Sequence, residues 1–159
     1  MRRLMKFLHT IGAIGLMGAM ACLVVLLGFV PAPKSLSDYA LMTAAMSGVV
    51  TWVFFPSLGL TLVAGLLAIA VNRAFHNAGW AWAKLATGVL VFEGGFTSIV
   101  GPLQEEAELA ARALAGDLDP ATLAPSFGSV RNVLWVLLAV TTANVVLGIW
   151  RPRLTRLPD

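Results

Sequence analysis

Long apolar runs alternate with short polar connections along the chain. Four runs stand out, at residues 7–30, 40–71, 79–100 and 129–150. Each reaches the roughly 20 residues that an α-helix needs to cross the hydrocarbon core of a bilayer. Because the runs take up most of the 159 residues, the pattern predicts an all-α protein. We expect a single integral membrane domain over residues 1–159, built as a bundle of four transmembrane helices in a lipid bilayer.

Proline and glycine divide the apolar runs. Pro31 and Pro33 end the first run, since neither suits a helix interior. The second run exceeds one perpendicular crossing, so its helix must tilt, kink or project. Pro56 removes one backbone donor within this run, which predicts a kink between Trp52 and Pro56. Gly101–Pro102 is expected to break the direction of the third helix.

Residues 102–116 follow with a different pattern. Apolar and charged positions succeed each other there with helical periodicity, and Gly116 supplies a C-terminal stop. The apolar face comprises Leu103, Ala107, Ala110, Ala111 and Leu114, and the charged side comprises Glu105, Glu106, Glu108 and Arg112. We therefore expect a short amphipathic helix in the outer loop between the third and fourth spans, packed on the membrane domain.

Composition and charge placement agree with this architecture. Hydrophobic residues make up 58% of the chain and charged residues 12%, whereas soluble domains carry about a quarter charged residues. The net charge is +3, and the basic side chains gather before the first run, between the second and third, and after the fourth: Arg2, Arg3, Lys6, Arg73, Arg151, Arg153 and Arg156. The positive-inside rule then places both termini in the cytoplasm, in a multi-pass protein of a bacterial-type cytoplasmic (inner) membrane. Membrane topology therefore explains the net positive charge of the chain, and we expect no nucleic acid as a partner.

The N-terminus resembles a signal peptide, since MRRLMK precedes an apolar run. The run at 7–30 is, however, longer than the roughly 7–15 apolar residues of such a peptide. We therefore expect it to remain in the protein as the first transmembrane helix.

Two charged side chains interrupt the third apolar run. Lys84 and Glu93 are nine positions apart, which places them on opposite faces of a helix and about 13.5 Å apart along its axis. They are therefore not expected to pair with each other, although charge inside a bilayer is costly and commonly functional. Two interpretations of Lys84 stay open. Its ammonium group reaches the interface on a flexible stem, or it lines a polar pocket.

Such a pocket is expected near the cytoplasmic side of the bundle. His9, His76 and Asn144 are predicted to lie at about the depth of Lys84. Together they would suit an anionic, planar or metal-bearing ligand, because they combine imidazole, ammonium and amide groups. Gly12 lies one turn beyond His9. It either leaves space for a flat ligand or lets two helices approach closely.

Glu93 needs a different explanation. It lies towards the outer end of the third run, and Arg131 lies close to the start of the fourth. We predict a structural ion pair between Glu93 and Arg131, since a lone buried carboxylate tends to protonate. The alternative is a protonatable Glu93 in a proton path.

Sulfur-bearing side chains form a third group. Met20, Cys22, Met42 and Met46 are expected at matching depths in the outer part of the first two spans. Thiolate and thioether ligands favour Cu(I), but methionine also fills gaps in apolar cores, and packing is the favoured interpretation. No nucleotide-binding or hydrolytic motif is present, so the sequence identifies no enzymatic reaction.

Three segments resemble a known group of membrane proteins. They are LHTIGAIGLMGAM at 8–20, FFPSLGLTLVAGLLAI at 54–69 and GWAWAKL at 79–85. Their order is similar to that of the four-helix membrane superfamily of CopD-like copper-resistance proteins and HemJ-like protoporphyrinogen oxidases. It looks closest to a small predicted membrane family of unknown function near that group.

The resemblance implies a role for two residues. His9 would match a first-helix histidine implicated in haem b binding or catalysis, and Lys84 would match a third-helix lysine. The HemJ-like proteins carry a histidine two residues before that lysine, where this chain has Trp82. This departure argues against protoporphyrinogen oxidation and leaves haem binding through His9. A six-coordinate iron would then take His76, Lys84 or a methionine as its second ligand.

Three functions are compatible with these observations. The leading hypothesis is a membrane protein that binds a haem-like cofactor near its cytoplasmic side, with a redox or electron-transfer role. The second is a protein that transports or handles copper or another small ion. The third is a structural accessory subunit without a ligand, in a homo-oligomer or beside a membrane partner, for which small residues such as Gly15 and Gly18 would supply the contacts.

Overall fold

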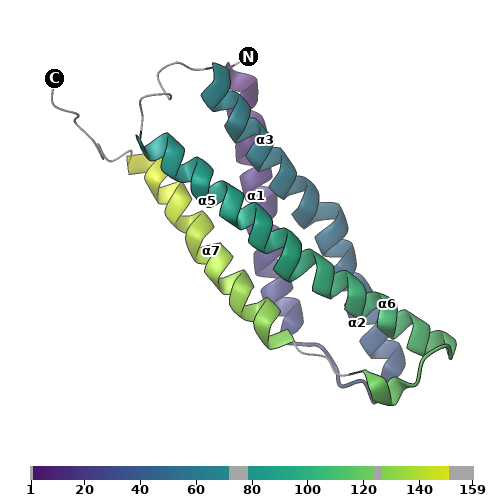
Figure 1. Ribbon diagram of the computed structural model, residues 1–159. Coiled ribbons are helices and arrows are strands. Elements are labelled where there is room, and N and C mark those ends of the chain that lie inside the picture. Colours follow the sequence, from purple (N-terminus) through teal and green to yellow (C-terminus); the bar gives the residue numbers. More distant parts are fainter. Residues whose placement is uncertain (1, 72–78, 124–126, 151–159) are drawn as a thin grey trace, which may run out of the picture.

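Helices make up nearly all of the described structure. The computed structural model describes residues 2–71, 79–123 and 127–150, and this part contains helices and their connections but no strand (Figure 1). Four helices in it are long and apolar enough to cross a membrane: Arg3–Leu27, Leu36–Val71, Gly79–Ala115 and Phe127–Trp150. Their number, length and composition confirm the predicted all-α, four-span architecture of a multi-pass membrane protein. Which side of the membrane holds the termini stays a prediction.

Two of these helices are uninterrupted and two are composite. The uninterrupted ones are α1 (Arg2–Leu27) and α7 (Phe127–Trp150). The second span consists of α2 (Leu36–Val49), a π-helical turn η1 (Val50–Phe54) and α3 (Phe55–Val71). The third consists of α5 (Gly79–Gly95), a π-helical turn η2 (Phe96–Val100) and α6 (Gly101–Ala115). A short 3₁₀ turn, η3 (Pro120–Thr122), follows α6.

Each π-helical turn ends two residues before a proline. Phe54 precedes Pro56, and Val100 precedes Pro102. A proline in a helix interior donates no hydrogen bond, and its ring collides with the carbonyl group four residues back, so a locally widened turn relieves both problems. The irregularity expected between Trp52 and Pro56 is therefore present as a π-helical turn. The break expected at Gly101–Pro102 is not found, because the widened turn carries the helix from α5 into α6.

The two composite helices are longer than a bilayer requires. They contain 36 and 37 residues, or about 54–56 Å at 1.5 Å per residue, against roughly 30 Å of hydrocarbon. α2 packs on α6, and this pair extends past the adjoining ends of α1 and α7 (Figure 1). The amphipathic segment is thus the end of the third long helix rather than a separate surface helix.

The buried face of α6 differs in part from the predicted one. Leu103 and Ala110 are buried as expected, and so is Ala113. Leu114 is 54% exposed and Ala111 is also exposed, because the neighbour of α6 is α2 and the stripe that faces α2 includes Ala113. Gly116 ends the helix in a left-handed conformation with φ of 86°, which glycine adopts at little cost.

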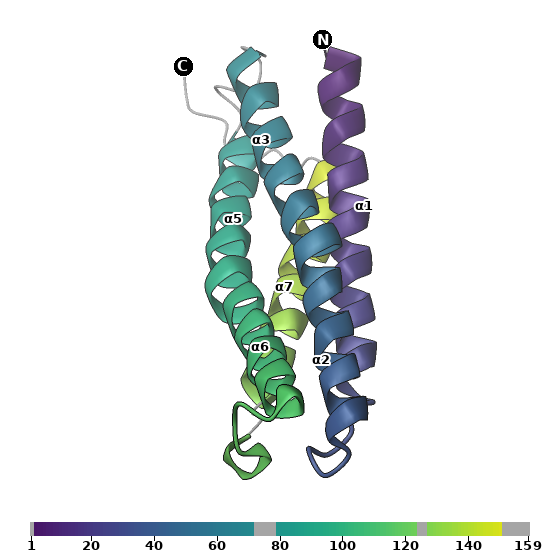
Figure 2. The same ribbon diagram turned by 90° about the vertical axis from the view of Figure 1, so that its right-hand side faces the viewer.

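α1 and the α2–α3 helix lie side by side along much of their length (Figure 2). Gly12 lies where the backbones of the two helices come close together. A Cβ atom there would lie 3.0 Å from the backbone nitrogen of Thr61 and 3.1 Å from the carbonyl oxygen of Ser57. Gly15 likewise faces the side chain of Ser57. Small residues thus let the two backbones approach, as in many membrane helix pairs.

The main apolar core occupies one half of the bundle. Its fully buried members come from the second half of α1, from α2 to the start of α3, from η2 with its neighbours, and from the first half of α7: Met20, Leu23, Met46, Val50, Phe54, Ile99 and Leu134. Towards the start of α1 and the end of α7 the buried residues become fewer and smaller, such as Ala64 and Ala81. The helices therefore enclose a cavity in that half.

Candidate functional site

A cavity of about 560 Å³ opens between α1, α3, α5 and α7, in the half of the bundle that holds the start of α1. Its size falls within the usual range for small-molecule sites. Leucine, valine, alanine and methionine side chains form most of the wall, and glycines from three helices widen it: Gly65, Gly88 and Gly148. The polar lining consists of Lys6, His9, Thr10, Thr61, Trp80, Lys84, Thr141 and Asn144. The cavity is thus apolar with a cationic and polar part.

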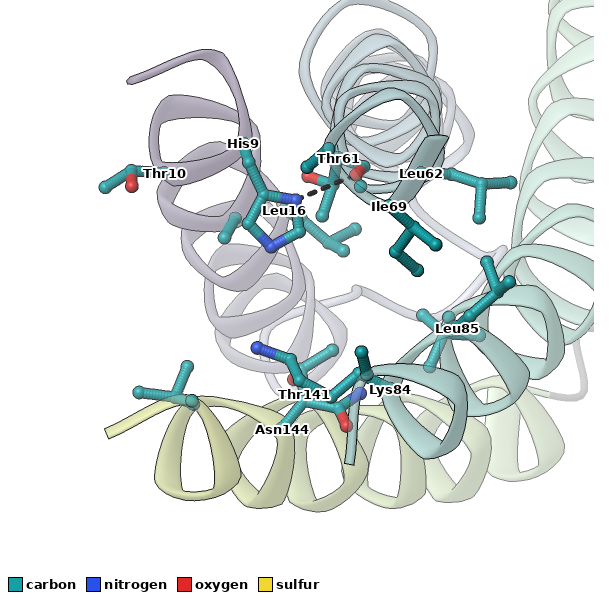
Figure 3. A pocket seen from close by; sticks show the side chains of 18 of the residues that line it. His9, Thr10, Leu16, Thr61, Leu62, Ile69, Lys84, Leu85, Thr141 and Asn144 are labelled. Atoms are coloured by element: carbon teal, nitrogen blue, oxygen red, sulfur yellow. Dashed lines mark hydrogen bonds between the residues drawn. The ribbon is translucent and has the colours of Figure 1, made fainter. Parts of the chain in front are cut away.

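His9 lies in the wall of this cavity and is held by α3. Its Nδ1–H donates a hydrogen bond of 2.9 Å to the carbonyl oxygen of Thr61 (Figure 3). Gly65 lies one helical turn further along α3, and a Cβ atom there would contact the imidazole ring at 3.6 Å. The ring therefore rests against a part of α3 that has no side chain. Its other nitrogen, Nε2, points into the cavity (Figure 3).

This hydrogen bond settles which nitrogen of His9 is available to a ligand. A ring nitrogen that donates to a carbonyl group carries the proton, so Nε2 of the neutral ring keeps its lone pair. Histidines that bind metals commonly donate their other N–H to a backbone carbonyl group in this way. His9 therefore has the orientation of a ligand to a metal or of a hydrogen-bond acceptor.

Lys84 reaches the same cavity from α5. Its Nζ atom lies beside Gly148 of α7, where a Cβ atom would come within 2.9 Å of it. Lys84 and His9 line the same cavity from different helices. The missing side chain at position 148 thus leaves room for an ammonium group between α5 and α7.

Asn144 is oriented by a neighbour on α5. The hydroxyl group of Thr87 donates a hydrogen bond of 2.9 Å to Oδ1 of Asn144. The NH₂ group is then the end of the amide that remains to donate. The cavity consequently brings together His9, Lys84 and Asn144, three of the residues that the sequence suggested for one pocket (Figure 3). His76 lies outside the described residues.

Gly12 takes a different role from the one considered for a ligand. It does not line the cavity, because the backbone of α3 fills the space beside it. Of the two interpretations, the structure assigns Gly12 to helix packing. Two methionines that sequence reasoning did not single out, Met5 and Met17, do line the cavity. Their spacing of four and eight residues from His9 places all three on neighbouring faces of α1.

Three of the four side chains in the sulfur-bearing group belong to the main core, and the fourth does not. Met20 and Met46 are fully buried in the main core, and Met42 packs against it. Cys22 is exposed and so lies on another face of α1. Within the described ranges, no cluster of three or more histidine, cysteine, aspartate or glutamate side chains could hold a metal ion.

Glu93 and Arg131 are both exposed. Within the described residues, no ion pair or hydrogen bond joins the side chains of Glu93 and Arg131. The predicted Glu93–Arg131 pair is thus not formed within one chain, because Glu93 points outward from α5.

A polar contact that sequence reasoning missed lies at the opposite end of the bundle. The hydroxyl group of Tyr39 on α2 donates a hydrogen bond to the carboxylate of Glu106 on α6. Tyr39 is the only tyrosine of the chain, and it lies 67 positions from Glu106, so no local sequence pattern signals the contact. The contact involves no cavity and is read as structural.

The cavity residues fit a haem-like group in three respects. Nε2 of His9 offers a nitrogen ligand to iron. The apolar wall suits a flat hydrophobic ring, and the ammonium groups of Lys84 and Lys6 offer partners for carboxylates. Comparisons with protein-family models, with curated proteins and with solved structures found no match for this chain. The fold and the cavity therefore define its class only as a four-helix, multi-pass membrane protein.

Proposed function

We propose that this membrane protein binds a haem-like cofactor in the cavity between α1, α3, α5 and α7 and takes part in redox or electron-transfer chemistry. The orientation of His9 carries the proposal, because its Nδ1–H is engaged with Thr61 and Nε2 is left to face the cavity. With both termini in the cytoplasm, as the charge distribution predicts, the site would lie on the cytoplasmic side of a bacterial-type inner membrane.

His9 and the residues around it would each have a different role in binding the cofactor. His9 would supply the iron ligand, and Thr61 would fix its tautomer and ring orientation. Lys84, Lys6 and the NH₂ group of Asn144 would hold carboxylates by charge-assisted or neutral hydrogen bonds. The apolar wall would exclude water from the ring. A bound haem supplies reversible one-electron chemistry at its iron.

A second iron ligand is compatible with this site. Met5 and Met17 line the cavity, so a thioether group could serve as that ligand. The copper-handling hypothesis receives no comparable support, because Cys22 is exposed while Met20 and Met46 are buried in a packed core.

The experiment is a visible spectrum of the protein purified in detergent after expression with supplemented haem. We expect a Soret band that is lost or strongly reduced in His9→Ala. The matched control is Thr142→Ala, which changes an exposed residue on α7 and should leave the band intact. Absence of a Soret band in the folded wild-type protein, or an unchanged band in His9→Ala, would refute the proposal.

A further inference from the structure

The cavity between α1, α3, α5 and α7 is long and runs along the helices. Its lining extends from Met5 to Met17 on α1 and from Leu58 to Val71 on α3, or about 18–20 Å at 1.5 Å per residue. Met17 lies close to the middle of the 25-residue span Arg3–Leu27. The cavity therefore reaches from one end of the bundle to mid-membrane, a depth comparable to the hydrocarbon of one leaflet, which is half of roughly 30 Å.

The two ends of the cavity differ in polarity. The ammonium groups of Lys6 and Lys84 and the amide group of Asn144 line the end near the start of α1. No acidic side chain is among the described residues that line the cavity, so this end is cationic. Apolar side chains line the mid-membrane end, namely Leu16, Met17, Leu58 and Val91.

Two threonines line the cavity further in, and neither offers its hydroxyl hydrogen to a ligand. Thr61 donates to the carbonyl oxygen of Ser57 at 2.7 Å, and Thr141 donates to that of Leu137 at 2.8 Å, each within its own helix. A polar group at this depth would thus lack these donors, which is costly. A matching ligand therefore combines an anionic head at one end with an apolar part that reaches mid-membrane.

The cavity also reaches the lipid-facing surface between α1 and α7. Four of its lining residues are exposed, namely Lys6, Thr10, Val71 and Val145. Val71 is the last residue of α3 and Lys6 lies at the polar end, whereas Thr10 on α1 and Val145 on α7 lie further inside. Figure 3 shows Thr10 on the side of α1 turned away from α3. Because both helices are candidate membrane spans, this opening faces the acyl chains of the bilayer.

We propose that the cavity of the haem-free protein binds a membrane lipid with an anionic headgroup, either a free fatty acid or an acidic phospholipid. The headgroup lies against Lys6 and the amide group of Asn144, and one acyl chain extends past Leu16 to Val91. The lipid has this same orientation in the adjoining leaflet, so it enters between α1 and α7 without turning over. The chain leaves one apolar environment for another, so the headgroup determines the selectivity. This binding does not rest on the haem proposal, although haem would compete for Lys6.

Photolabelling in phosphatidylcholine vesicles tests the occupant. The probe is palmitate with a diazirine group on its chain, added to the haem-free protein. We expect label on cavity-lining residues of α1, displaced by excess palmitate but not by hexadecanol, which has the same chain without the charge. Displacement by phosphatidylglycerol as well would show that an acidic phospholipid also enters, and displacement by palmitate alone would identify the free fatty acid. Label confined to lipid-facing residues, or equal displacement by hexadecanol, would overturn the proposal.

A charge variant tests the polar end. Lys6→Gln should raise the probe concentration for half-maximal labelling about two- to fivefold, the range for an accessible ion pair. Arg3→Gln is the matched control, because Arg3 is exposed on the same helix and does not line the cavity. Equal values for the two variants contradict the assignment of the headgroup to this end.

A second pair of variants tests the opening. Ala13 lines the cavity one turn beyond Thr10, so Ala13→Phe should remove most of the label. Ile14→Phe should retain it, since Ile14 is 64% exposed and lies outside the cavity. Equal labelling of this pair would refute entry between α1 and α7. All measurements use haem-free protein, so they and the haem spectrum can fail independently.

Discussion

The Tyr39 hydroxyl group donates a hydrogen bond of 2.5 Å to Oε1 of Glu106, and this bond joins α2 to α6 in the pair that extends past α1 and α7. Tyr39 is fully buried and belongs to a small cluster with Ala40 and Ala110, separate from the main core. The hydrogen bond thus adds to the apolar contacts by which α2 and α6 pack on each other.

Tyr39→Phe should therefore destabilise the protein. It removes the donor and leaves the partly buried Glu106 carboxylate without that partner, which should lower the free energy of unfolding by about 1–2 kcal/mol, towards the low end for charge-assisted bonds. Unfolding in detergent micelles, followed by circular dichroism, measures this loss. Glu105→Gln is the matched control, because Glu105 is exposed on the same helix. A Tyr39→Phe variant as stable as the control would show that the bond contributes nothing.

Two glycines of α1 should respond differently to alanine. A Cβ atom at Gly12 would press on the backbone of α3, whereas at Gly18 nothing lies within 4 Å. Overpacking costs typically about 1–3 kcal/mol, so Gly12→Ala should lower the stability by that amount. Gly18→Ala should be neutral or stabilising, since alanine favours the helix. The same unfolding assay compares them, and equal effects at both positions would contradict the close contact of α1 with α3.

The sequence was sufficient to predict the features that depend on local pattern. Run length predicted the four membrane helices, and Pro56 predicted an irregularity where η1 lies. The continuity of the helix through Gly101–Pro102 was not predictable, because a π-helical turn accommodates proline only when the neighbouring packing supports it. The choice between the two interpretations of Gly12 and the burial of Ala113 were not predictable for a related reason. Their surroundings are set by which helix lies opposite, and periodicity does not reveal that.

In the candidate site, too, some features follow from the sequence pattern and others depend on how the helices pack. His9, Lys84 and Asn144 were grouped by depth alone, since position along a membrane helix fixes depth. The bond from His9 to Thr61 and the space beside Gly148 depend on the lateral arrangement of four helices. Because many arrangements share the same depths, these contacts require the three-dimensional structure.

Gly148 should control the position of the Lys84 ammonium group. In Gly148→Ala the new Cβ atom would come within 2.9 Å of Nζ, and the flexible end of the lysine side chain, rather than the backbone, should move. We expect unchanged unfolding and a two- to fivefold loss of haemin affinity, about the contribution of an accessible ion pair. Titration followed at the Soret band measures this affinity.

A double variant distinguishes this effect from a general disturbance of the site. If Gly148→Ala acts through Lys84, it should cause no further loss in a Lys84→Gln background. Additive losses would show that residue 148 affects binding by another route. Gly128→Ala serves as the control for glycine replacement on α7, because nothing lies within 4 Å of a Cβ atom there.

The transmembrane arrangement makes a prediction about sidedness. Arg3 begins the first span and Glu108 lies in the extension of the third, and both are exposed. In a Cys22→Ser background, a membrane-impermeant thiol reagent added to intact cells should label Glu108→Cys but label Arg3→Cys only after the membrane is opened. The reason is that the positive-inside rule places the basic N-terminus in the cytoplasm, while a helix that spans the bilayer carries position 108 to the other side. Labelling of both cysteines in intact cells would contradict this topology, and labelling of Arg3→Cys alone would invert the orientation and move the His9 cavity to the outer side.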